Sequence, residues 1–283
     1  MQIRIYLILL VALISVSSTA LVIRYLEDLD PVLLAFWRML FASILLWIYS
    51  YNIKNYTSYS VNRVWTIIAG IFLGLHFALF FIGVRTTSIP SATLLACTAP
   101  IFTATISWLK GENLSKAALL GLLLSVLGIV IVQSFNNDLT RGNLYGNLLS
   151  LLSGLCIAIT FVFAKKIRLT TENVVYGREV FFVASLTLLA FSLLTKTSLF
   201  SFSKADLPWF LFLGLFPSIL GHNMLNYTIK YLSPTAVASV PLGEPIIASL
   251  FSYLIFFESI PFGVIAGAPF IFFGIFLLVR QSN

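Results

Sequence analysis

The chain has 283 residues, of which 59% are hydrophobic and 10% are charged, with a net charge of +7. Soluble domains carry about 25% charged residues, so this composition excludes a soluble fold, and the abundance of apolar side chains excludes a disordered chain. Because one membrane-spanning helix uses about 20 residues, the length allows about ten spans and leaves no room for a sizeable soluble domain.

Ten apolar segments of 19 to 23 residues follow one another along the chain, and each predicts a membrane-spanning helix. In chain order they cover residues 5–23, 31–51, 64–84, 89–108, 115–133, 144–164, 174–194, 207–229, 234–256 and 261–279. Capping residues or prolines mark several starts, namely Asp30-Pro31, Ser115, Ser233-Pro234 and Pro261. The loops are short, so consecutive helices are expected to be antiparallel neighbours in an all-α integral membrane protein.

The basic residues are distributed unevenly between the two sides of this topology. With both termini in the cytoplasm, the inner side holds ten of them: Arg4, Lys54, Arg63, Lys110, Lys116, Lys165, Lys166, Arg168, Lys230 and Arg280. The outer side then holds five: Arg24, Arg85, Arg141, Lys196 and Lys204. Cytoplasmic loops carry the excess of Lys and Arg, so we predict a multi-pass protein of the cytoplasmic (inner) membrane with both termini inside. The same excess accounts for the net charge without a nucleic-acid partner.

The two halves of the chain are similar at a spacing of about 140 to 146 residues. The matching pairs are Arg38 with Arg178, Phe72-Leu73-Gly74-Leu75 with Phe212-Leu213-Gly214-Leu215, Ser91-Ala92 with Thr235-Ala236, Ala99-Pro100-Ile101 with Glu244-Pro245-Ile246, and Gly128-Ile129 with Gly274-Ile275. We expect repeat 1 to cover residues 1–139 with helices 1–5, and repeat 2 to cover residues 140–283 with helices 6–10. An odd number of helices inserts the second copy upside down, and such inverted repeats are typical of secondary transporters.

Several of these stretches resemble a known family. They are Phe36-Trp37-Arg38-Met39-Leu40, Pro90-Ser91-Ala92 through Pro100 to Gly111-Glu112, and Tyr231-Leu232-Ser233-Pro234 through Gly243-Glu244-Pro245 to Glu258. Over most of its length the chain resembles the drug/metabolite transporter (DMT) superfamily, in its ten-helix branch of two EamA domains. The resemblance implies a central cavity lined by helices 1–4 and 6–9, with helices 5 and 10 peripheral. It also implies transport of amino acids or other small metabolites, often outward.

Ionisable residues inside predicted spans are functional candidates, because burying them costs several kcal/mol. Glu244 lies about 15 Å into its helix, near the midplane, and stands beside Pro245. Proline frees a backbone carbonyl one turn earlier, so this carboxylate is a candidate coupling or gating site for a proton or cation. The alternative is a structural glutamate that pairs with an arginine or a backbone amide.

The arginines differ in depth. Arg38 lies about 10 Å into its span, where it is expected either to bind a substrate carboxylate or phosphate or to pair with Glu244. The neighbouring Trp37 either stacks on a planar ligand or packs against other helices. Arg178 lies only about one turn into its span, so its long side chain can reach the inner interface, and we expect a gating or structural role.

Two further helices carry polar candidates. Ser218, His222 and Asn226 are spaced i, i+4, i+8, which places them on one face of an α-helix, and we expect that face to line the cavity. His76 lies among phenylalanines that include Phe80, and both are candidates for the cavity wall. A lone histidine on an apolar face is equally compatible with a core position.

We therefore expect a secondary transporter, an exporter of small organic metabolites such as amino acids or related compounds, that works by alternating access. The alternative is a transporter of nucleotide-like or phosphorylated metabolites, such as S-adenosylmethionine, nucleosides or sugar phosphates. A channel or membrane-embedded sensor is the non-transporter alternative. Without a Walker A motif, a nucleophile–base pair or a cluster of metal ligands, no ATP hydrolysis, enzyme activity, cofactor or metal is expected. The expected partners are a small-molecule substrate, the lipid bilayer and a coupling proton or cation, with a homodimer left open.

Overall fold

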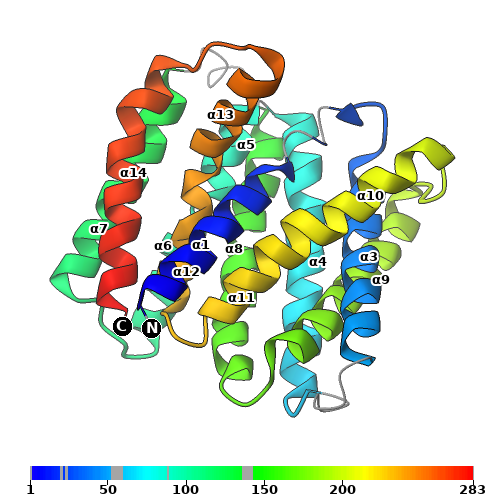
Figure 1. Cartoon of the computed structure of the whole chain (residues 1–283), viewed down its shortest axis with the longest axis horizontal. Coiled ribbons are helices and arrows are strands. Elements are labelled where there is room, and N and C mark those ends of the chain that lie inside the picture. Colours follow the sequence, from blue (N-terminus) through cyan, green and yellow to red (C-terminus); the bar gives the residue numbers. More distant parts are fainter. Residues whose placement is uncertain are drawn as a thin grey trace.

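The structure is a computed structural model that describes residues 2–19, 22, 25–51, 60–87, 89–135 and 143–282. Every regular element of these residues is a helix (Figure 1). Three basic residues of the charge comparison, Arg24, Lys54 and Arg141, lie outside the described residues.

The helices follow the predicted apolar segments closely. The first half of the chain forms α1 (Gln2–Ser17), α3 (Pro31–Tyr51), α4 (Arg63–Thr86), α5 (Ile89–Ala96), α6 (Ala99–Leu109) and α7 (Lys116–Ser134). The second half forms α8 (Leu144–Arg168), α9 (Asn173–Thr195), η2 (Lys204–Asp206), α10 (Leu207–Leu213), η3 (Gly214–Asn223), α11 (Met224–Thr228), α12 (Pro234–Ser239), η4 (Val240–Gly243), α13 (Glu244–Phe256) and α14 (Phe262–Gln281).

Eight helical segments among the described residues are long and apolar enough to cross a membrane. The apolar helix α1 and the unbroken run from α10 through η3 to α11 occupy the other two predicted spans. The protein is therefore a multi-pass membrane protein of ten transmembrane helices. Three predicted caps are also confirmed: the backbone N–H groups of Val32, Ala118 and Ala236 donate to the side chains of Asp30, Ser115 and Ser233, at 2.7, 3.1 and 3.2 Å.

The packing has the symmetry that an inverted repeat requires. Helix α4 of the first half packs against α8 of the second, and η3 of the second half packs in the same way against α1 of the first. The contact of α4 with α9 likewise has its counterpart in the contact of η3 with α3. The two-fold pairs α3 with α9 and α7 with α14 also contact each other, and α7 and α14 lie together at one side of the bundle (Figure 1). The two five-helix repeats are thus wound into one bundle in opposite orientations.

Small residues allow the closest of these helix contacts. A Cβ atom added at Gly70 of α4 would lie 2.5 Å from Cβ of Val183 in α9, and one added at Gly74 would lie 2.7 Å from Cβ of Thr187. Side chains at these two positions would therefore push α4 and α9 apart. The spacing of the two glycines is that of a small-residue packing face in membranes.

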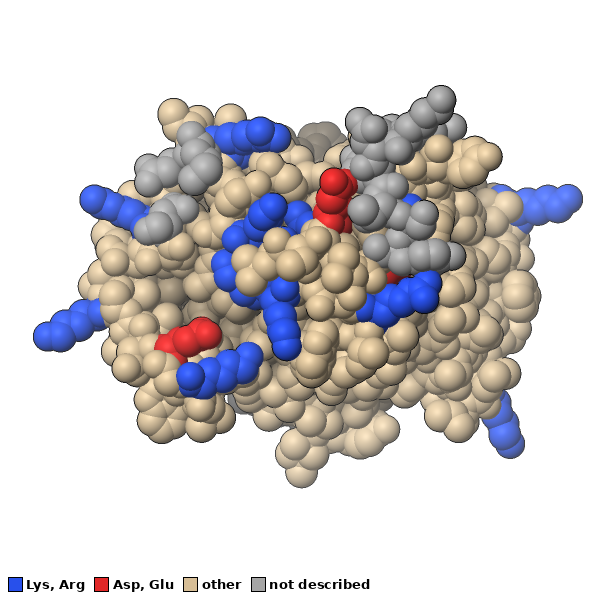
Figure 2. Space-filling model, turned by 90° about the horizontal axis from the view of Figure 1, so that it is seen from below, with Lys and Arg blue, Asp and Glu red and all other residues tan. Residues whose placement is uncertain are grey.

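Both termini lie at the same end of the bundle (Figure 1). Lys and Arg side chains gather on that end, as Figure 2 shows. The last turn of α8 carries Lys165 and Lys166, together with the buried Arg168. Basic residues are expected on a cytoplasmic face, and the placement of both termini in the cytoplasm stays a prediction.

Three spans are interrupted near the middle of the bundle. The fourth span breaks at Cys97 and Thr98, between α5 and α6, just before Pro100. The ninth span narrows into the 3₁₀ turn η4, and the eighth widens into the π-helix η3, which contains Pro217. Pro100 and Pro217 lie at two of these interruptions, because proline removes a helical donor and crowds the preceding turn.

Candidate functional site

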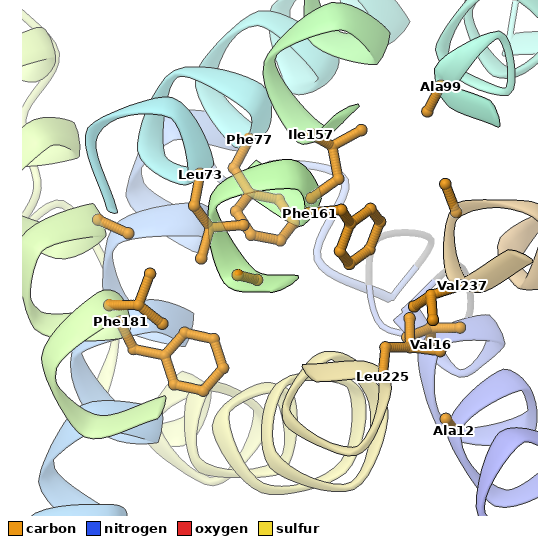
Figure 3. Packing of buried hydrophobic residues seen from close by; sticks show 14 of the residues in the cluster. Ala12, Val16, Leu73, Phe77, Ala99, Ile157, Phe161, Phe181, Leu225 and Val237 are labelled. Carbon is orange, nitrogen blue, oxygen red and sulfur yellow. The ribbon is translucent and has the colours of Figure 1, made fainter. Parts of the chain in front are cut away.

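A central cavity lies between the two halves of the bundle. Its lining residues are Val16, Thr19, Arg38, His76, Phe77, Phe80, Phe81, Thr93, Ala96, Cys97, Ala99, Ile157, Phe161, His222, Ala238, Pro241, Leu242 and Glu244. Figure 3 shows the apolar side chains Phe77, Ile157, Phe161 and Val16 converging from three helices around this region. The lining comes from spans 1–4, 6, 8 and 9, whereas α9, which was also expected at the cavity, packs behind α3 and α4.

The structure brings five of the sequence-predicted site residues to this cavity. They are Arg38, His76, Phe80, His222 and Glu244, which come from α3, α4, η3 and α13. All other lining side chains are apolar or uncharged. The cavity therefore has an apolar, partly aromatic wall with one acidic, one basic and two imidazole groups.

The two interrupted spans related by the repeat meet at this cavity. Cys97 lies in the break of the fourth span and Ala99 follows it, while Pro241 lies in the 3₁₀ turn of the ninth span and Glu244 follows that turn. Discontinuous helices at matching places in two inverted repeats are typical of transporter binding sites. The breaks in the fourth and ninth spans thus lie at the same cavity as Arg38 and Glu244.

The backbone around Glu244 explains its position. Pro245 has no N–H for the carbonyl of Pro241, and the N–H of Glu244 donates to that carbonyl instead, in a tighter 3₁₀ bond. The carbonyl that the sequence predicts to be freed is therefore occupied by this bond. Glu244 is the first residue of α13, where the positive end of the helix dipole favours a carboxylate. Its side chain is half-buried and lines the cavity.

Arg38 is held on two sides. Its Nε donates to Oγ of Ser218 at 2.9 Å, and its guanidinium carbon lies 4.5 Å from the centre of the Phe77 ring. The residue is 3% exposed, and its Nη2 has no hydrogen-bond partner among the described residues. A buried, unpaired donor on a cation is costly, so an anionic group entering the cavity would relieve that cost.

The suggested pairing of Arg38 with Glu244 is present in the described residues as an attraction between their charges, without a direct contact. Both residues line the cavity, but within the described part of the chain no hydrogen bond or ion pair joins them. The physical reason is that Ser218 and the face of Phe77 already fix the guanidinium, while Glu244 starts a helix in the other half. The two opposite charges thus attract each other within one cavity without touching.

The aromatic wall is organised around Phe77. Its ring contacts Arg38, meets His222 edge-on with ring centres 5.4 Å apart, and lies 4.9 Å from the ring of His76. Nδ1 of His76 lies 3.0 Å from the carbonyl oxygen and 2.9 Å from Oγ of Ser153, so α8 anchors this imidazole. Sequence reasoning proposed Phe80 and missed Phe77, although the pattern of Phe77, Phe80 and Phe81 beside His76 could have indicated a shared helix face.

Trp37 lies in an aromatic cluster away from the cavity-lining set. Its Nε1 donates to the carbonyl of Leu199 at 2.8 Å, and its ring stacks on Phe210 with centres 6.0 Å apart. Phe200 and Phe202 meet the ring edge-on. The packing interpretation of Trp37 therefore fits the structure, and the stacking of a ligand on Trp37 does not.

The expected polar stripe on the eighth span is divided. His222 lines the cavity, and Ser218 lies behind Arg38. Asn226 is buried farther along the span, where its backbone carbonyl accepts a hydrogen bond from Nε of Arg168 at 3.1 Å. The prediction that Asn226 lines the cavity is therefore wrong. The reason is that Asn226 belongs to α11, which follows η3, and lies one turn beyond His222, past the residues that line the cavity.

Arg178 has a local environment like that of Arg38 but lies outside the cavity-lining set. Its Nη1 donates to Oγ of Ser50 at 2.7 Å, and its guanidinium carbon lies 3.9 Å from the centre of the Trp47 ring. The hydroxyl of Ser43 donates to the carbonyl of Arg178 at 2.8 Å. These contacts tie α9 to α3, so the structure places Arg178 in the contact between the repeats.

Known proteins share this sequence pattern and fold. The model of the EamA-like transporter family matches residues 2–134 and 144–280. An uncharacterized transporter of Archaeoglobus fulgidus is 28% identical over 211 residues, which cover 75% of this chain and 74% of its own. The uncharacterized inner membrane transporter YedA of Escherichia coli is 28% identical over 168 residues, 58% of this chain and 53% of its own. A crystal structure with a TM-score of 0.81 and 16% identity covers 100% of this chain and 99% of its own, which shows a common fold.

Proposed function

Since the chain belongs to the EamA-like transporter family, we propose that it is a secondary carrier that exports small zwitterionic metabolites, amino acids or related compounds, across the cytoplasmic membrane. The observation that carries this proposal is the pair of opposite charges, Arg38 and Glu244, that stand separately in one apolar cavity. A zwitterion places one anionic and one cationic group a few ångströms apart, and such a cavity can bind both.

The charges favour a zwitterion over the phosphorylated alternative. A phosphate carries about two negative charges at neutral pH, whereas Arg38 is the one Lys or Arg side chain among the described lining residues. Glu244 would repel such an anion. An amino acid instead directs its carboxylate to Nη2 of Arg38 and its ammonium group to Glu244, and its side chain contacts the phenylalanine wall.

Glu244 is also our candidate for energy coupling. The carboxylate comes from the start of a half-helix next to the cavity, and among the described residues no side chain pairs with it. Such a group can bind a proton or a cation in one state of the carrier and release it in the other. The two broken spans supply flexible points about which one repeat can rock against the other.

A ligand-stabilisation screen of the purified protein in detergent tests the substrate class. We expect amino acids to raise the melting temperature and sugar phosphates and nucleosides to leave it unchanged, because a bound ligand stabilises the folded state. Stabilisation by nucleosides, S-adenosylmethionine or sugar phosphates, without an effect of amino acids, would contradict the proposal and favour the nucleotide-like alternative.

A further inference from the structure

The eighth span holds a serine that contacts the cavity arginine without lining the cavity itself. We propose that Ser218 is a positioning residue, which orients the guanidinium of Arg38 so that Nη2 is kept for the anionic group of the transported molecule. This inference rests on the proposed function of Arg38. It adds a residue that acts through Arg38, without touching the ligand, and it assigns a role to the proline in the π-helix.

The chain of contacts begins at Pro217. Because proline has no N–H, the carbonyl of Leu213, one turn earlier, loses the donor that an α-helix would supply. In the π-helix η3 the backbone donor comes from five residues on, the N–H of Ser218, in place of the missing proline N–H. The hydroxyl of Ser218 donates to the same Leu213 carbonyl at 2.8 Å. The proline thus leaves the Leu213 carbonyl to the next residue in the chain, whose hydroxyl is drawn to it.

This bond fixes the direction of the second bond. A serine hydroxyl has one proton, and once that proton is given to Leu213 the oxygen can only accept. Nε of Arg38 donates to it at 2.9 Å. Ser218 is fully buried and Arg38 is 3% exposed, so bulk water does not compete for either bond.

The ring of Phe77 completes the constraint. The serine holds one edge of the planar guanidinium, and the aromatic ring covers one of its faces at 4.5 Å. A planar group held at an edge and a face cannot rotate about its stem without losing both contacts. Its Nη2 is then the buried donor left without a partner among the described residues. Repeat 2 therefore orients, through Ser218, the anion-binding group that repeat 1 contributes.

The chain offers a matched control in Ser50 and Arg178. That pair also joins a serine hydroxyl to an arginine, at 2.7 Å, and the arginine also lies over an aromatic ring. Neither residue belongs to the cavity-lining set. Ser50→Ala removes the same kind of bond as Ser218→Ala and should leave Arg38 unaffected.

Two measurements on the purified full-length protein test the proposal. The first follows the Nε–H signal of Arg38 by nitrogen-15 NMR, identified by its loss in Arg38→Lys, and measures its exchange with solvent. We expect slow exchange in the wild type and in Ser50→Ala, and exchange faster by about tenfold or more in Ser218→Ala. Ser218→Thr keeps the hydroxyl and should retain slow exchange.

The second measurement compares the binding of L-leucine with that of L-leucinamide, which lacks the carboxylate. We expect Ser218→Ala to weaken the binding of leucine by about tenfold and to change the binding of leucinamide little. Unchanged exchange of the Arg38 signal in folded Ser218→Ala protein would overturn the proposal, as would faster exchange with unchanged leucine binding. If no amino acid binds the wild type, the proposed function fails, while the NMR result still decides whether Ser218 orients Arg38.

Discussion

Arg38 and Glu244 line one cavity from opposite repeats, and within the described residues no ion pair joins them. Arg38 is fixed by Ser218 and Phe77, whereas Glu244 begins the half-helix α13. Two separate charges in an apolar wall cost free energy unless a ligand or a solvated state compensates them. This relationship leads to several predictions about transport and stability.

Removing the charge of Glu244 should uncouple transport. In Glu244→Gln we expect exchange of substrate to persist, whereas accumulation driven by a pH or cation gradient falls to the level of liposomes without protein. The reason is that an amide keeps the shape of the side chain but cannot take up a proton at this position. The measurement is uptake into proteoliposomes with and without the gradient, with the exposed Glu172→Gln as control. Normal accumulation with unchanged pH dependence in Glu244→Gln would show that the carboxylate is structural.

Replacing Arg38 with lysine should weaken amino-acid binding by about tenfold or more, although the charge is retained. Lysine lacks both the planar fork and the Nε–H that donates to Ser218. Isothermal calorimetry of the purified protein measures the effect. Arg178→Lys makes the same change outside the cavity-lining set, and equal losses of affinity in both variants would argue against a specific role of Arg38.

Cys97 supplies a natural probe of the cavity. It lines the cavity beside the break in the fourth span, whereas Cys156 is 7% exposed and is not among the lining residues. A thiol reagent should label Cys156→Ser protein, and a ligand at about ten times its dissociation constant should slow that labelling about tenfold, because about nine tenths of the sites are filled. Cys97→Ser protein should label little. If saturating ligand does not slow the labelling of Cys97, the ligand binds outside this cavity.

The contact of α4 with α9 should be sensitive to a single methyl group. Gly70→Ala places a Cβ 2.5 Å from Cβ of Val183, so we expect a loss of about 1–3 kcal/mol and a lower melting temperature. The second change Val183→Gly should restore part of that loss, because it removes the Cβ that stands 2.5 Å away. Ile71→Ala, at an exposed position of the same helix, serves as control, and an equal loss there would contradict this explanation.

Much of the fold can be predicted from the sequence, because the bilayer demands apolar runs of fixed length. The ten segments and the caps at Asp30, Ser115 and Ser233 follow from hydrophobicity and from short-range hydrogen bonding. Arg38 and Glu244 could be selected because a charge inside a span is expensive and therefore rarely accidental.

The details of the candidate site could not be predicted, because they depend on packing between distant parts of the chain. The role of Phe77 could not be distinguished from that of other phenylalanines, since it follows from contacts with three residues on two other spans and its own helix. Asn226 was misplaced because the i, i+4, i+8 spacing indicates a shared helix face but not how far along that face the cavity extends. Trp37 was open to two interpretations until its bond to Leu199 could be seen.

The most direct test of the central claim is substrate counterflow in proteoliposomes. We expect uptake of a labelled amino acid to saturate, to accelerate when the same amino acid is present unlabelled inside, and to be lost in Arg38→Ala. These properties require a carrier whose single site faces the two sides alternately. Uptake that stays linear with concentration and is not accelerated from the opposite side would show a channel and contradict the account.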